Sequence, residues 1–208
     1  VKEDEVIELT RELVKIPSHV DTPGREKEVA QFIYEFCKKE GLETELIEVD
    51  GERTNVMAYI KGEGDGKTLL FNGHTDTVPP YDMTIEPYGG EVKDGFVWGR
   101  GGNDMKGAIA SMLIAMVGLK RAEAKLNGNI IFAGVIGEEE RSEGTEYLVK
   151  NGIKADGAIV GEPSNYEYAI GHRGLEWLEI KVKGKAAHGG VPNLGVNAIS
   201  KAAKLILK

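Results

Sequence analysis

The stretch 69–80, with the sequence LLFNGHTDTVPP, constrains the fold of this chain more than any other. A short apolar run leads through Gly73 to His74 and Asp76, and prolines 79 and 80 prevent further strand pairing. Side chains alternate along a strand, so His74 and Asp76 should leave the strand end on the same side. A carboxylate beside an imidazole fixes the tautomer of a metal-binding histidine. The pair therefore suggests a metal site, although an ordinary polar strand end has the same pattern.

Apolar periodicity divides the rest of the chain into alternating helices and strands. Helical spacing predicts helices over 3–16, 25–40, 105–121, 145–150 and 196–207, the third of them apolar nearly all round. Short apolar runs predict strands over 42–49, 55–60, 69–74, 129–136 and 157–160, and a hairpin over 90–98. Strands that alternate with helices are typical of an α/β fold, here a mostly parallel sheet flanked by helices.

The character of the sequence changes near residues 171–174. Residues 175–182 approach the alternation of a half-buried strand, and one more helix follows. We therefore expect a first domain over 1–172 and the beginning of a second domain over 173–208. One strand and one helix cannot form an independent domain. Either the chain is a fragment of a longer protein or another chain completes the second domain, and we favour the fragment.

Composition excludes several classes of partner. The net charge of −8 argues against nucleic acid and anionic membrane surfaces, which favour basic patches. The acidic first residues do not resemble a signal peptide, and no apolar run is long enough to span a bilayer, so we expect a cytoplasmic protein. Cys37 is the single cysteine and allows neither an internal disulfide nor a thiolate cluster. Any metal must be bound by histidine and carboxylates.

Four places offer such ligands, each directly after a predicted strand or turn: His74, Asp104, the run 138–140 and Glu162. In open α/β sheets, ligands bind at the carboxyl ends of the strands, where these groups would converge. One histidine with several carboxylates suits Zn²⁺, Mn²⁺ or Co²⁺, and the surplus of carboxylates suits two ions bridged by one aspartate. Taken singly, the three glutamates fit a solvated face and Asp104 fits a helix cap.

Taken together, four motifs resemble the dinuclear-zinc amidohydrolases and peptidases. They are HTDTVP at 74–79, GRGGNDMKG at 99–107, the glutamates at 138–139 and GEPS at 161–164, in that order. This family includes acetylornithine deacetylase, succinyl-diaminopimelate desuccinylase and glutamate carboxypeptidase. The resemblance covers essentially the whole chain. It implies a zinc-peptidase-like catalytic domain over 1–172 and the start of a smaller α+β lid or dimerisation domain over 173–208.

The resemblance implies a specific set of metal ligands. His74 would bind one ion together with Glu162, Asp104 would bridge both ions, and Glu139 would bind the second. The ions would be Zn²⁺, with Co²⁺ or Mn²⁺ as alternatives. The family closes its second metal site with a histidine far downstream that this sequence does not contain, so we expect the chain as written to be catalytically impaired.

The resemblance also implies catalytic roles. Asp76 would orient His74, Glu138 would be the general base, and His188 would reach the partner subunit's active site and help to stabilise the oxyanion. Three adjacent glutamates leave the register ambiguous. We choose Glu138 as the base because the family pattern Asp-Glu-Glu then begins at Gly137, where glycine replaces the usual aspartate.

These assignments predict a metal-dependent hydrolase that cleaves the amide bond of an N-acylated amino acid. The segments 161–164 and 171–174 favour the acetylornithine deacetylase or succinyl-diaminopimelate desuccinylase type, in a homodimer formed through the lid domain. A metallo-dipeptidase or carboxypeptidase that takes short peptides is the main alternative. A non-catalytic metal-binding module is another. A nucleotide-binding protein is a weaker candidate, because residues 99–102 lack the glycine spacing of phosphate-binding loops.

Overall fold

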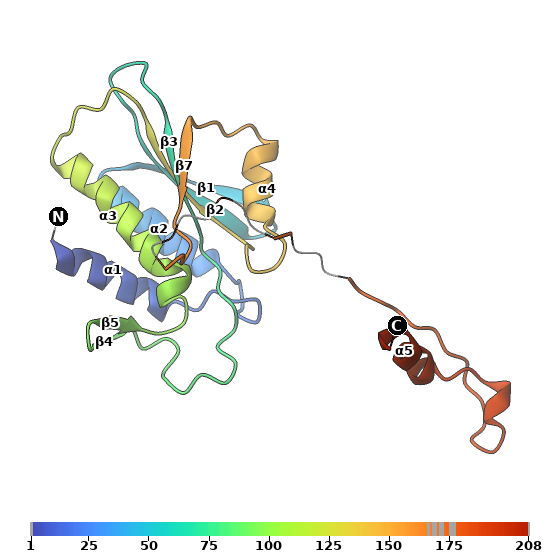
Figure 1. Cartoon of the computed structure of the whole chain (residues 1–208). Coiled ribbons are helices and arrows are strands. Elements are labelled where there is room, and N and C mark those ends of the chain that lie inside the picture. Colours follow the sequence, from blue (N-terminus) through green and yellow to red (C-terminus); the bar gives the residue numbers. More distant parts are fainter. Residues whose placement is uncertain (1, 166, 168–169, 171–172, 175–177, 208) are drawn as a thin grey trace. The chain divides into compact units, whose positions relative to one another are not determined.

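The computed structural model describes residues 2–207 except 166, 168–169, 171–172 and 175–177. Contacts divide the chain into two compact units, Val1–Glu167 and Tyr168–Lys208 (Figure 1). The boundary expected from the sequence lies a few residues later. That these units are a catalytic domain and part of a lid stays a prediction.

The first unit contains every helix and strand expected for that part of the chain. Its helices are α1 (Glu3–Lys15), α2 (Lys27–Lys39), α3 (Gly107–Arg121) and α4 (Glu143–Lys150). Its strands are β1 (Glu43–Asp50), β2 (Arg53–Ile60), β3 (Leu69–His74), β4 (Glu91–Lys93), β5 (Phe96–Trp98), β6 (Ile130–Val135) and β7 (Gly157–Val160). Each begins and ends within a few residues of its expected bounds.

Five strands form one sheet in the order β1-β2-β6-β3-β7, and β4 pairs only with β5 (Figure 1). β3 lies between β6 and β7 and runs parallel to both. β2 lies between β1 and β6 and runs antiparallel to both. The α/β fold is therefore confirmed, with a parallel part around β3 and an antiparallel edge. The carboxyl ends of β3, β6 and β7 meet at one edge of the sheet.

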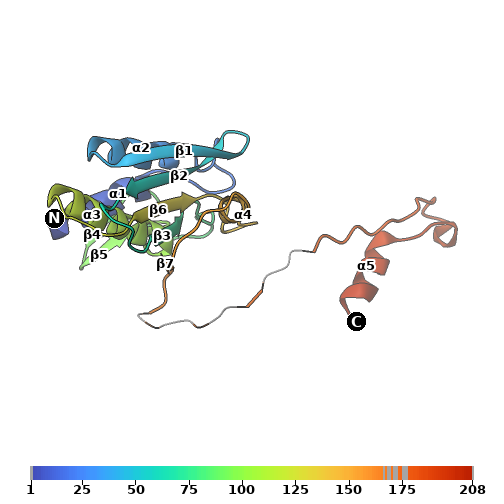
Figure 2. The same ribbon diagram turned by 90° about the horizontal axis from the view of Figure 1, so that it is seen from above.

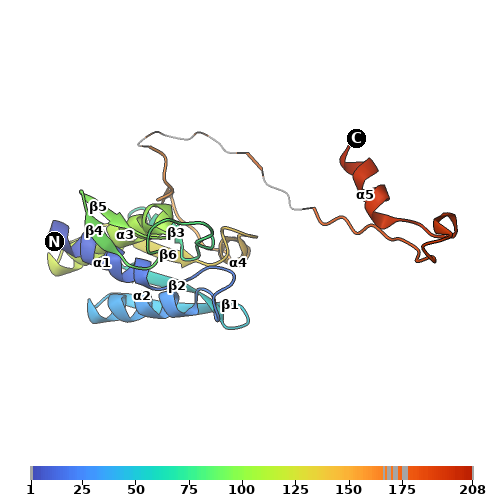
Figure 3. The ribbon, with the colours of Figure 1, turned by 90° about the horizontal axis from the view of Figure 1, so that it is seen from below.

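Helices cover both faces of this sheet. α1, α2 and α3 bury one face, and their core includes Leu13, Ile33, Ile109 and Phe132, all fully buried. α4 lies on the opposite side, where Leu148 packs in a smaller cluster with residues of β2 and β6 (Figures 2 and 3). α3 is the buried helix that its apolar sequence predicted, because it packs against the sheet and α1 at once. The face-by-face burial follows the two-residue period of the strands.

The second unit contains α5 (Ala198–Ile206), which begins where the side chain of Asn197 accepts a hydrogen bond from the Ser200 amide. A short turn, Pro192–Leu194, and a bridge between Lys185 and Val196 precede the helix. The strand expected over 175–182 falls partly outside the described residues, and residues 178–182 form no strand. A strand needs a paired neighbour, and the described part of this unit supplies none there. Among the described residues, no helix has both the length and the apolar character needed to cross a membrane.

Candidate metal centre

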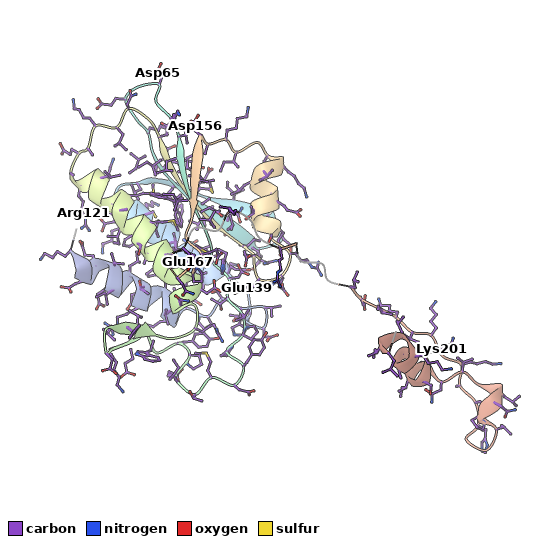
Figure 4. The ribbon with its side chains drawn as sticks, viewed as in Figure 1. Asp65, Arg121, Glu139, Asp156, Glu167 and Lys201 are labelled. Atoms are coloured by element: carbon purple, nitrogen blue, oxygen red, sulfur yellow. The ribbon has the colours of Figure 1, made fainter. Side chains whose placement is uncertain are left out.

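His74 is the last residue of β3 and is 1% exposed. The residue before His74 is Gly73, because α3 and the turn that precedes α3 pack closely against the strand. A Cβ at position 73 would lie 2.9 Å from the methyl carbon of Met105. β3 therefore ends beside the turn that precedes α3, at the carboxyl edge of the parallel strands. Figure 4 shows Glu139 toward this end of the sheet, with Asp65 and Asp156 at the other.

The two nitrogens of the His74 ring face different surroundings. Nδ1 lies 3.0 Å from the backbone oxygen of Asp76 and 3.5 Å from the carboxylate of the same residue. Nε2 faces carboxylates, with Asp104 at 3.0 Å, Glu162 at 3.4 Å and Glu138 at 3.9 Å. A hydrogen on Nδ1 that donates to Asp76 leaves Nε2 as the ligand atom.

These contacts also control protonation of the ring. Burial by itself lowers the pKa of His74, but hydrogen bonds with Asp104, Asp76 and Glu162 raise it to about 12, above the usual 6.5. Without a metal, an imidazolium therefore balances part of the negative charge. A metal ion has to displace this proton, so its binding depends on pH.

The buried carboxylate of Asp76 connects His74 to the acidic loop that follows β6. Its two oxygens accept hydrogen bonds from the backbone amides of Glu138 at 3.1 Å and Glu139 at 2.9 Å. Burial by itself would raise the pKa of Asp76, but His74 and these two amides hold it below its usual value. The geometry suits the predicted role of orienting His74. It adds a second role, holding the backbone of the two glutamates.

Four carboxylates gather around the ring in two overlapping groups. His74 forms one group with Asp104 and Glu139 and another with Glu138 and Glu162, and the ligand atoms in each lie within 4.8 Å of one another. Burial raises the pKa of both Glu138 and Glu139. Neighbouring carboxylates such as Asp104 raise the pKa of Glu139 further. One imidazole with several carboxylate oxygens is a donor set that fits a divalent ion.

The grouping differs in two respects from the ligand set that the sequence resemblance implied: His74, not Asp104, belongs to both groups, and Glu138 belongs to one of them. Glu138, the expected base, lies as close to the ring as a ligand would, in the same group as Glu162. The structure thus brings His74, Asp76, Asp104, Glu138, Glu139 and Glu162 together, while their individual roles stay predictions. His188 lies in the second unit, where its Nδ1 accepts a hydrogen bond from the Gly190 amide at 3.1 Å. Its catalytic role also stays a prediction.

Asp104 sits in an irregular turn, Gly102–Lys106, directly before α3. Lys106 is fully buried, and its ammonium donates a 2.6 Å hydrogen bond to the backbone oxygen of Ile16 at the end of α1. Burial lowers the pKa of Lys106 to about 7. The lysine ties the turn that presents Asp104 to α1. Sequence reasoning gave it no role, although it stands inside the motif that contains Asp104.

Asn55 is a second residue that sequence reasoning missed. Its fully buried amide accepts a hydrogen bond from the Ile136 backbone at 3.1 Å and donates one to the Gly144 backbone at 2.9 Å. These two hydrogen bonds hold both ends of the acidic loop against Asn55 in β2. A polar residue within an apolar strand was the available signal, but its partners lie more than 80 positions away.

Comparison with known proteins identifies the family of this chain. The model of Peptidase family M20/M25/M40 matches residues 70–206. A probable succinyl-diaminopimelate desuccinylase of Staphylococcus epidermidis is 34% identical over 204 residues, covering 96% of this chain and 49% of the relative. A probable carboxypeptidase of Aspergillus clavatus is 36% identical over 199 residues, covering 91% of this chain and 46% of the relative.

Among solved structures, an M20 family metallo-carboxypeptidase from Sulfolobus solfataricus superposes with a TM-score of 0.64 at 27% identity, covering 76% of this chain and 37% of that one. The chain spans about half the length of the curated relatives that it matches. The resemblance drawn from the four sequence motifs is thereby confirmed: this chain belongs to the M20/M25/M40 family of peptidases.

Proposed function

We propose that these residues belong to a metal-dependent hydrolase that cleaves the amide bond of an N-acylated amino acid. One observation carries the proposal: a buried imidazole at the end of β3 meets carboxylates from three other segments at the carboxyl edge of the parallel strands. Membership of a peptidase family supports the hydrolase class. Because the chain spans about half of its relatives, the proposal concerns the activity of the whole protein.

The proposed cofactor is a pair of divalent ions, Zn²⁺ first, with Co²⁺ or Mn²⁺ as alternatives. His74 and Glu162 would hold one ion, Glu139 the other, and Asp104 both. Support comes from the presence of all four of these residues among the ligand atoms that group around His74. Bound divalent ions supply a Lewis acid that polarises the carbonyl and makes water more acidic.

The remaining steps are assigned to side chains of this chain. Asp76 holds the imidazole of His74 and the backbone of the two glutamates, so the site is ordered before substrate arrives. Glu138 takes a proton from the attacking water and returns it to the leaving amine. Its side chain is 46% exposed, so solvent can reach it. His188 would act on the oxyanion from a partner subunit.

The proposed substrate is the acylated amino acid of a desuccinylase or deacetylase, because the Staphylococcus epidermidis relative bears the name of a desuccinylase. A metallo-carboxypeptidase acting on short peptides is the second candidate, favoured by the relatives from Aspergillus clavatus and Sulfolobus solfataricus. Homodimerisation through residues 173–208 and a cytoplasmic location also stay proposals.

Metal analysis combined with hydrolysis assays tests this function. The whole protein, once purified, should bind about two divalent ions and hydrolyse N-succinyl-diaminopimelate or N-acetylornithine faster than a dipeptide. His74→Ala should lose metal, and Glu138→Gln should keep metal but lose turnover. Glu146→Gln is the matched control, since Glu146 pairs with Lys150 on the surface of α4. Full metal occupancy in His74→Ala would refute the ligand assignment, and normal turnover in Glu138→Gln would refute the base.

A further inference from the structure

Three consecutive glutamates follow β6, but only two of them lie with their carboxylates around His74. Glu138 and Glu139 belong to the groups of ligand atoms described above. The carboxylate of Glu140 instead forms an ion pair with the guanidinium of Arg25, a residue 115 positions earlier in the chain. The pair is partly buried, with the Arg25 side chain 23% exposed. The fold therefore gives Glu140 a different partner from Glu138 and Glu139, although the three side chains are chemically identical.

The turn that carries Arg25 is itself firmly anchored. The next residue, Glu26, is fully buried and accepts two hydrogen bonds from Arg53, at 2.8 and 2.7 Å. The same guanidinium also pairs with Glu143 at the start of α4. Arginines 25 and 53 thus connect the segment before α2 to both ends of the stretch 140–143.

The turn at Gly137 fixes the backbone around the three glutamates. Gly137 has a φ of +74°, and its backbone oxygen accepts hydrogen bonds from the amides of residues 140, 141 and 142. A Cβ at this position would overlap the carboxylate of Glu143, which is the carboxylate that pairs with Arg53. Asp76 accepts hydrogen bonds from the amides of Glu138 and Glu139 and so holds the backbone of these two residues, whereas the carboxylate of Glu140 is held by Arg25.

We propose that Arg25 is a positioning residue that holds Glu140 away from the metal centre. A free Glu140 carboxylate would compete with its neighbours for a cation and would draw the loop out of register. The pairing leaves Glu138 and Glu139 alone to face His74. This inference rests on the proposed metal centre, while the order of the loop can be measured without metal.

Four variants separate this role from simple loop stability: Arg25→Met, Arg25→Lys, Glu140→Gln and the double variant Arg25→Met/Glu140→Gln. Co²⁺ binding is followed by calorimetry and visible absorption. Arg25→Met should weaken binding about tenfold or more and alter the spectrum. The double variant should return close to wild-type affinity, because the competing carboxylate is gone. Arg25→Lys should also retain affinity, since it keeps the charge.

Arg121→Met is the matched control, because Arg121 pairs with Glu5 and Glu40 at the far end of α3 (Figure 4). It should leave Co²⁺ binding unchanged. Amide hydrogen exchange of Glu138 and Glu139 in the metal-free protein is the second measurement, and Arg25→Met should accelerate both by about tenfold.

A double variant that binds Co²⁺ as poorly as Arg25→Met would overturn the proposal, and so would an Arg25→Met variant indistinguishable from wild type. If the wild-type chain binds no Co²⁺, the metal-centre proposal fails by itself. The exchange rates then decide whether Arg25 holds the loop: unchanged rates overturn the inference, and faster rates support it.

Discussion

Replacing Asp76 by Asn should release the acidic loop while preserving side-chain volume. Asp76 is 3% exposed, and its two carboxylate oxygens accept one backbone hydrogen bond each, from Glu138 and Glu139. An asparagine offers one oxygen and must point its amide group at the other N–H. A hydrogen bond to a charged group contributes about 1.5–3 kcal/mol, and an unsatisfied buried donor costs about 1–3 kcal/mol. The loop should therefore open more easily by about 3 kcal/mol, a change of about a hundredfold in its opening equilibrium.

Native-state hydrogen exchange of the metal-free protein, followed by NMR, measures this directly. The Glu138 and Glu139 amides should exchange about a hundredfold faster in Asp76→Asn. The Thr75 amide, bonded to the Val135 backbone at 2.8 Å, is the internal control and should not change. The pKa of His74 should fall, because Asp76 is one of the groups that raise it. Glutamate amides that exchange at the wild-type rate would refute the reasoning.

Three further predictions concern the surroundings of the site. Arg53→Met leaves the buried Glu26 carboxylate without its partner and should lower the free energy of unfolding by about 3–5 kcal/mol in urea titrations; a loss below about 1 kcal/mol would contradict this. The raised pKa of His74 stabilises the metal-free fold. This contribution is complete below pH 6.5 and is lost as the pH rises toward about 12. Zn²⁺ binding at pH 7 should consequently release about one proton, seen by calorimetry in two buffers of different ionisation enthalpy, and no release would contradict the protonated ring. Gly137→Ala should destabilise the protein by about 1–3 kcal/mol, because of the positive φ and the overlap with Glu143, and an unchanged melting temperature would exclude that strain.

Much of the fold follows from local patterns in the sequence. The two-residue period around 69–76 predicted a strand that delivers His74 and Asp76 together, and the apolar run after Asp104 predicted the buried helix α3. These features are local because strand and helix periodicities act over a few residues. The expected strand at 175–182 shows the limit of this reasoning: residues 178–182 have the alternation but no neighbouring strand in the described part of their unit.

The sequence by itself determined which residue types could form a metal centre and which strand would carry its histidine. Only the tertiary structure decided the antiparallel edge of the sheet, the approach of Glu138 to the ring and the separation of Glu140 from its neighbours. The physical reason is distance along the chain. Arg25 meets Glu140 across 115 positions, and Arg53 meets Glu143 across 90. Such ion pairs leave no periodic trace in the sequence, because they exist only once packing has brought separate segments together.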